Sequence, residues 1–163
     1  MRRTIPIQRF DLARFIEIMV DFWKDEVSAH EAAFTFVGDT GLAAFGTDCL
    51  WDEAETVGEG PLDWLHHGKA LFARFFRQFD GRYEGADGTT WDDPEDEENE
   101  ESLHELSGFE LGSYGFLVSL SGDRLSIQTA VLREVSGECR VTPVKTAGPF
   151  EKPMIQFIES MER

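Results

Sequence analysis

Apolar residues recur at helical spacing near the start of the chain. Successive members of this stripe are four, three, four and four positions apart: Leu12, Ile16, Met19, Trp23 and Val27. This spacing predicts a helix from Asp11 to about Phe34, with Asp11 as its N-cap. Further apolar residues beside the stripe (Phe15, Ile18 and Phe22) indicate a central helix that is covered on more than one side.

A second helical pattern begins at Pro61, in the first-turn position that proline favours. One face of this predicted helix carries Leu62, Leu65, Phe72, Phe76 and Phe79. Asp80-Gly81 is expected to end it. Several glycines interrupt the intervening residues 35–60, where we expect one or two short strands.

Beyond Ser107 the pattern changes from helical to alternating. Two runs carry inward-facing residues at every second position: Tyr114, Phe116, Val118 and Leu120, then Leu125, Ile127, Thr129 and Val131. Gly122-Asp123 between them predicts a hairpin, and a turn at 136–138 leads into a third strand at 140–145. A short helix after Pro149 and Pro153 is expected to pack on the body through Met154, Phe157, Ile158 and Met161.

These elements predict one α+β domain over residues 1–163. Two N-terminal helices and a C-terminal helix would pack on a small antiparallel sheet, a three-stranded meander or larger. A chain of 163 residues is long enough for one substantial core and short for two. Its 14 Phe and 4 Trp supply that core.

A dense run of carboxylates interrupts this pattern. Eight of the twelve residues from Trp91 to Ser102 are Asp or Glu, and none is Lys or Arg. Burying unpaired carboxylates is costly, so these side chains must stay in water, bind cations or meet a basic partner. We name residues Asp92–Glu101 the acidic run, and expect it to lie in a flexible loop at about 84–102.

The formal net charge of the chain is −17, from 32 acidic and 15 basic residues. This balance argues against direct binding of nucleic acid, which depends on Lys and Arg, and against attraction to anionic membranes. It favours association with a basic protein, and it is equally consistent with a simple role in solubility. No segment has the apolar run of a signal peptide or a membrane span, which predicts a cytoplasmic protein.

Catalytic and metal-binding motifs are absent from the sequence. His66 and His67 are adjacent on the second predicted helix, and with Asp63 they supply fewer ligands than a zinc site needs on one face. His30 and His104 are isolated. The serines precede turn glycines outside any nucleophile elbow, and the acidic run lacks the glycine position of a calcium-binding EF-hand. We therefore predict no catalytic residue, metal or cofactor.

Cys49 and Cys139 lie 90 positions apart without CxxC spacing. Two reduced thiols are the favoured interpretation, and a disulfide between them stays open.

The leading hypothesis is a non-enzymatic protein that neutralises a basic partner. The candidate partner-binding residues are Trp91, Asp92, Asp93, Glu95, Asp96, Glu97, Glu98, Glu100 and Glu101. Tyr83 and Trp91 flank the loop as candidate aromatic anchors, although both could simply pack its base onto the body. In composition the chain is similar to bacterial immunity proteins and phage-encoded inhibitors, which implies a toxin or a nucleic-acid-binding protein as partner.

Two alternatives stay open at this point. One is a small enzyme or ligand-binding protein with a pocket between helices and sheet, lined by His66, His67 and Asp63. The other is an accessory subunit without activity of its own, docked through its first helix. The oligomeric state does not follow from the sequence.

Overall fold

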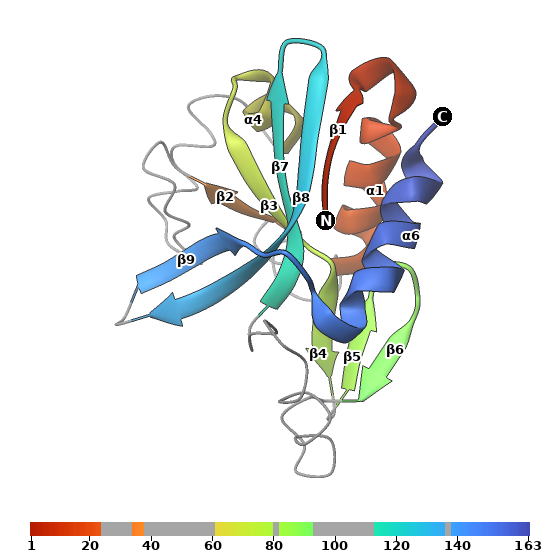
Figure 1. The fold of residues 1–163 in the computed structure, drawn as a ribbon, viewed down its shortest axis with the longest axis vertical. Coiled ribbons are helices and arrows are strands. Elements are labelled where there is room, and N and C mark those ends of the chain that lie inside the picture. Colours follow the sequence, from red (N-terminus) through yellow and green to blue (C-terminus); the bar gives the residue numbers. More distant parts are fainter. Residues whose placement is uncertain (24–33, 38–60, 80–81, 93–112, 136–137) are drawn as a thin grey trace.

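The computed structural model describes residues 1–23, 34–37, 61–79, 82–92, 113–135 and 138–163 (Figure 1). Its helical elements are η1 (Ile7–Arg9), α1 (Leu12–Trp23), α4 (Pro61–His66), η2 (Gly148–Phe150) and α6 (Glu151–Met161). Its strands are β1 (Arg2–Pro6), β2 (Phe34–Val37), β3 (Ala70–Arg74), β4 (Phe76–Phe79), β5 (Arg82–Gly85), β6 (Thr90–Asp92), β7 (Ser113–Ser121), β8 (Arg124–Val135) and β9 (Glu138–Pro143). Helices and antiparallel strands together confirm the predicted α+β character.

The larger sheet has the strand order β1-β8-β7-β3-β2, and β9 also pairs with β8. Strand β8 is long enough to pair twice along one edge, with β1 through Arg124–Gln128 and with β9 through Ala130–Val135. Gly122 has φ +61 in the two-residue turn between β7 and β8, as the hairpin prediction required. The predicted β7-β8-β9 meander is confirmed, and the sheet is larger, since β1, β2 and β3 join it.

The second predicted helix, from Pro61 to Asp80, is wrong beyond His66. Helix α4 ends there, Gly68 adopts φ +77, and the chain continues as β3 and β4. Strand β3 lies between β2 and β7, and Leu71, Phe72 and Ala73 are all fully buried. A strand that is buried on both faces reads as a continuous apolar run, which periodicity does not distinguish from a buried helix. The described part of the chain therefore has one N-terminal helix, α1, in place of two.

Helix α1 begins as predicted, and its described part runs to Trp23. The backbone N–H of Arg14 donates to Oδ1 of Asp11 at 3.2 Å, which is the contact of an N-cap. Phe34, the predicted end of this helix, instead begins β2. Residues 24–33 lie outside the described part, as do the short strands expected after residue 37.

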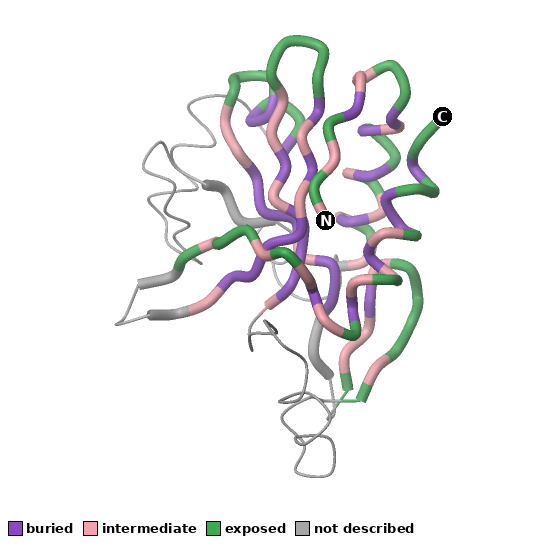
Figure 2. The backbone as a smooth tube through the Cα atoms, in the orientation of Figure 1, coloured by how far each residue is buried: buried purple, intermediate pink, exposed green. Residues whose placement is uncertain are grey.

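Helices α1 and α6 lie on one face of the larger sheet (Figure 1). The Phe15 ring of α1 lies 6.2 Å from that of Phe116 in β7 and 6.0 Å from that of Phe157 in α6. Helix α6 buries Met154, Phe157, Ile158 and Met161, as its pattern predicted. Buried residues concentrate where these helices meet the sheet (Figure 2).

The chain crosses from the larger sheet to a small one at Phe75. Its backbone N–H donates to the carbonyl of Tyr114 in β7 at 3.2 Å, and its carbonyl accepts from the N–H of Ala86 at 2.7 Å. The small sheet has the order β4-β5-β6. One residue therefore ties the β5–β6 hairpin to the main sheet through its backbone.

Ion pairs hold the two ends of the chain together. Arg3 in β1 pairs with Glu159 at 2.7 Å and with Glu162, both near the end of α6. Partial burial lowers the pKa of the Arg3 guanidinium, and the hydrogen bonds that Arg3 donates to Glu162 and Glu159, together with their negative charges, outweigh it, so that the net shift of the pKa is upward. The backbone N–H of Asp11 also donates to the carbonyl of Met161 at 2.8 Å.

Candidate protein-binding surface

The acidic run starts at the end of a β-hairpin, which occupies the first part of the segment where a loop was expected at about 84–102. Strands β5 and β6 pair Tyr83 with Trp91 and Arg82 with Asp92. Between them Gly88 adopts φ +84, and the backbone N–H of Gly85 donates to the carbonyl of Thr89 at 2.8 Å. Residues 82–92 thus form ordered antiparallel structure up to the first residue of the run.

Asp87 is one of the acids that made this segment look like a loop, and it serves the turn. Its Oδ1 accepts from the backbone N–H of Thr89 at 3.0 Å, and its Oδ2 accepts from the Thr89 hydroxyl at 2.6 Å. Asp and Asn favour turns because their short side chains bond the backbone two residues on.

The aromatic residues of the hairpin pack on the core. The Trp91 ring lies 5.1 Å from that of Phe150, nearly perpendicular to it, and 6.0 Å from that of Phe75. Tyr83 contacts the same Phe150 at 6.1 Å and lies edge-on to Phe76 at 4.9 Å. Such edge-to-face pairs contribute about 0.5–1.5 kcal/mol each beyond their area burial. Tyr83 and Trp91 therefore pack onto the body, as the second interpretation of these residues expected. A role of Trp91 at an interface stays a prediction.

Gly85 makes room for the Trp91 ring. A Cβ at this position would lie 2.6 Å from Cη2 and 2.8 Å from Cζ3 of Trp91, well inside van der Waals contact. The ring therefore lies directly over the backbone of β5 at Gly85.

Of the predicted partner-binding residues, the structure describes Trp91, which is half-buried, and Asp92, which is exposed. The others lie outside the described residues: Asp93, Glu95, Asp96, Glu97, Glu98, Glu100 and Glu101. So does the second acidic group of the sequence, Asp52, Glu53, Glu55 and Glu59.

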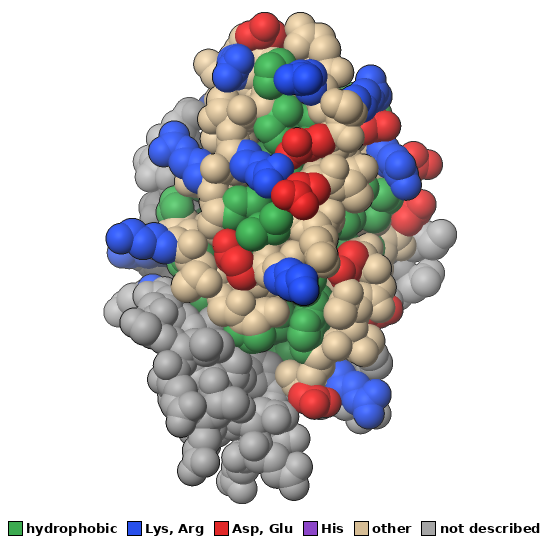
Figure 3. All heavy atoms as spheres, turned by 45° about the vertical axis from the view of Figure 1, so that its right-hand side comes forward, with side chains coloured by type: hydrophobic (Ala, Val, Ile, Leu, Met, Phe, Trp, Pro, Cys, Tyr) green, Lys and Arg blue, Asp and Glu red, His purple; other side chains and the backbone are tan. Residues whose placement is uncertain are grey.

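The formal net charge of the residues that the structure describes differs from that of the remaining residues. The described residues carry 14 Lys and Arg and 13 Asp and Glu, a formal net charge of +1. The remaining residues carry the other 19 acids and a single base, a net charge of −18. On the face shown in Figure 3, basic and acidic side chains are interleaved. The excess acidity of the composition therefore comes from residues outside the described ranges.

The residues suggested as the lining of a pocket lie on α4 or directly after it, and their side chains are exposed. Asp63, His66 and His67 are exposed, whereas Trp64 and Leu65 are buried against the sheet. Within the described ranges, no group of three or more His, Cys, Asp or Glu residues could hold a metal ion. His30, His104 and Cys49 lie outside those ranges, so that a meeting of Cys49 with Cys139 is not tested.

The residues that sequence reasoning missed are those beneath the hairpin, above all Phe75, Gly85 and Phe150. A local signal for the hairpin was present, since Asp87-Gly88 lies between two short segments with a central aromatic residue. Nothing local pointed to Phe150, because it comes from the far end of the chain.

Comparison with protein-family models, curated proteins and solved structures finds no match to this chain. Among the helices that the structure describes, none combines the length and the apolar character needed to cross a membrane.

Proposed function

We propose that this protein is a non-enzymatic binding protein of the immunity or inhibitor type. It neutralises a basic partner, such as a toxin or a nucleic-acid-binding protein, through the acidic run and the Trp91 at its base. One observation supports this most directly. Asp92 is exposed at the end of a hairpin whose aromatic side chains pack in the core, so that seven further carboxylates follow from an anchored point.

The charge distribution gives this arrangement a physical consequence. Eight carboxylates within the ten residues of the acidic run concentrate negative charge, which would attract an approaching cation. Electrostatic steering of this kind raises association rates by about 10- to 1,000-fold and weakens as salt screens the charges. A partner surface built to bind phosphates would match such a row of carboxylates.

The decisive experiment compares three chains in a lysate pull-down at about 100 mM salt, where the Debye length is ~10 Å. They are the wild type, a variant with Asn or Gln at all eight acids of the run, and a matched control that exchanges Asp for Glu and Glu for Asp. The control keeps every charge and alters only side-chain length. All three should share one far-ultraviolet circular dichroism spectrum and one unfolding midpoint.

A basic protein captured by the wild type and the exchanged control, and lost from the neutral variant, is the expected result. Its association rate constant, measured by surface plasmon resonance, should fall at least tenfold in the neutral variant, with a smaller change in dissociation. Capture of the same partner with unchanged affinity by the neutral variant would show the proposal to be wrong.

Trp91→Phe tests the aromatic part of the surface separately. The phenyl ring keeps part of the packing on Phe150, so a drop in affinity without a matching drop in stability would indicate direct contact with the partner. The enzyme alternative gains no support from the described residues, since Asp63 and His66 on α4 and His67 just after it are exposed.

A further inference from the structure

Strand β6 lies at the outer edge of the small sheet (Figure 1). Within the described ranges it pairs with β5 alone, and no backbone hydrogen bond outside that pairing involves Thr90 or Asp92. The side chains of both residues are exposed. A strand edge with unpaired N–H and C=O groups can accept a further strand.

The register of the hairpin shows which backbone groups of β6 point outward. The N–H of Gly85 donates to the carbonyl of Thr89 at 2.8 Å, so these residues form a hydrogen-bonded pair of the hairpin. Such pairs alternate along an antiparallel ladder, so Trp91 bonds to β5 through its backbone. Thr90 and Asp92 occupy the positions between, and their N–H and C=O groups point away from β5. The outer edge of β6 therefore offers two donors and two acceptors.

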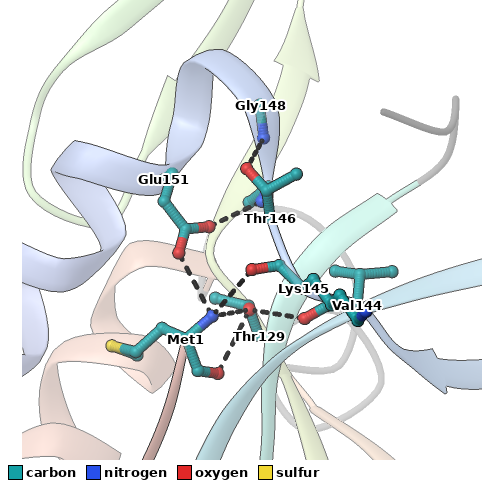
Figure 4. A network of polar contacts seen from close by, with 8 residues as sticks. Met1, Thr129, Val144, Lys145, Thr146, Gly148 and Glu151 are labelled. Carbon is teal, nitrogen blue, oxygen red and sulfur yellow. Dashed lines mark hydrogen bonds and ion pairs between the residues drawn. The ribbon is translucent and has the colours of Figure 1, made fainter. Parts of the chain in front are cut away.

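Strand β6 is already held in place from the side of the core. The Trp91 ring packs on that of Phe150, with the ring centres 5.1 Å apart. Phe150 belongs to η2, where its N–H donates to the carbonyl of Ala147 at 3.1 Å and the N–H of Gly148 donates to the Thr146 hydroxyl oxygen at 3.1 Å (Figure 4). A strand that is ordered beforehand loses less conformational entropy when a partner binds.

Charge determines which kind of strand this edge favours. Asp92 lies opposite Arg82 of β5. A Lys or Arg opposite Asp92 on an added antiparallel strand would continue the alternation of sign, with Cβ atoms about 4.5–5.5 Å apart. A second copy of this chain would instead bring another Asp92 to the same short edge, and like charges on neighbouring strands are destabilising. The edge therefore favours a basic extended segment over self-pairing.

We propose that the outer edge of β6, from Thr90 to Asp92, binds an extended basic segment of the partner protein as an added β-strand. The outward N–H and C=O groups bind the backbone of that segment, and Asp92 selects a Lys or Arg opposite it. This inference rests on the function proposed above and adds to it the way in which the partner is recognised.

The test uses the full chain and a capped peptide of about eight residues, an ordinary strand length, in which Lys and Thr alternate. When a Lys lies opposite Asp92, the lysine N–H groups face β6 and the threonine N–H groups face away. Two control peptides therefore carry a methyl group on the backbone nitrogen of every Lys or of every Thr. All three peptides have the same charge.

Isothermal titration calorimetry at about 100 mM salt compares the three peptides. The unmodified and the threonine-methylated peptides should bind the wild type with similar affinity. The lysine-methylated peptide should bind at least about tenfold more weakly, because two hydrogen bonds to β6 are lost. Equal binding of all three peptides would overturn the proposal, and so would the absence of binding by any of them.

Thr90→Pro tests the same edge on the protein. Proline removes the outward N–H of residue 90, keeps every charge and is tolerated on edge strands. The variant should bind the unmodified peptide as weakly as the wild type binds the lysine-methylated one. Thr90→Val keeps the N–H and is the matched control, with nearly unchanged affinity. Should Thr90→Pro fail to fold, the three peptides on the wild type still decide.

A variant with Asn or Gln at the seven acids of the run after Asp92 separates this inference from the proposed function. Equal binding of all three peptides to the wild type, lost from this variant, would overturn strand addition and leave the acidic run as the binding surface. A selective loss on lysine methylation, with equal affinity for the wild type and this variant, would support strand addition and refute the role of the run. Self-association of the wild type that Thr90→Pro abolishes would assign the edge to a second copy and overturn the proposal.

Discussion

Gly115 is the residue at which one added methyl group should most disturb the central sheet. It lies in β7, opposite Arg74 of β3 and Ala130 of β8, and it is buried. A Cβ there would lie 2.2 Å from the carbonyl oxygen of Ala73 and 2.8 Å from Cζ of Phe72. Strand β3 thus passes so close to β7 that only glycine fits, and the Phe72 ring covers the gap.

Two opposing effects determine how much Gly115→Ala changes the free energy of unfolding. Restricting the unfolded chain would stabilise the protein by about 0.4–1 kcal/mol where the native geometry accepts alanine. Forcing a methyl group into a packed region costs about 1–3 kcal/mol, and here the nearest atom is a backbone oxygen that cannot rotate away. We expect a net loss of about 2 kcal/mol in the free energy of unfolding, which lowers the equilibrium constant by ~30-fold.

Urea unfolding followed by circular dichroism measures this loss as a lower midpoint at an unchanged m-value. Ser119→Ala in the same strand, at a half-exposed position, is the control and should change stability by no more than about 0.5 kcal/mol. Adding Phe72→Leu to Gly115→Ala should restore nothing, since the Ala73 oxygen stays in the way. A Gly115→Ala variant as stable as the wild type would refute the close approach of β3 and β7.

Three further substitutions test local features of the fold by thermal or urea unfolding. Asp11→Ala removes the N-cap of α1 and should cost about 1 kcal/mol, whereas Asp11→Asn keeps an acceptor and should cost much less; equal losses would contradict the cap. Arg3→Gln removes two partly exposed ion pairs, with Glu159 and Glu162, and should cost no more than about 1 kcal/mol, with a smaller loss at high salt; a salt-independent loss would exclude an electrostatic origin. Gly68→Ala places a side chain at φ +77 and should cost about 1–2 kcal/mol, with Gly68→Asn less affected; two equally stable variants would argue against the left-handed turn.

The C-terminal half of the fold was largely predictable because its main elements show local sequence patterns. Alternation in β7 and β8, the Gly122-Asp123 turn and the stripe of α6 are local patterns, and the structure confirms all of them. The N-terminal half was harder for two physical reasons. Strand β3 is buried on both faces and reads like a helix, and β1 buries only Ile5 among its five residues.

The candidate binding surface was also predictable only in part. Composition alone revealed the acidic run, because clustered carboxylates have no place in a core. The support beneath it was not predictable, because Trp91 and Phe150 meet through tertiary packing between distant parts of the chain. Sequence reasoning therefore found the charges, and the structure was needed to find the hairpin from which they start.

The pairing of β1 with β8 also determines when β1 can join the sheet during synthesis of the chain. Arg2 pairs with Gln128, so the partner of the first strand is made 126 residues later. At about 5–20 residues per second, this interval lasts roughly 6–25 s. Throughout that time β1 lacks its β8 partner, so the backbone N–H and C=O groups that later pair with β8 are open to water, and this part of the sheet forms only after most of the chain has been made.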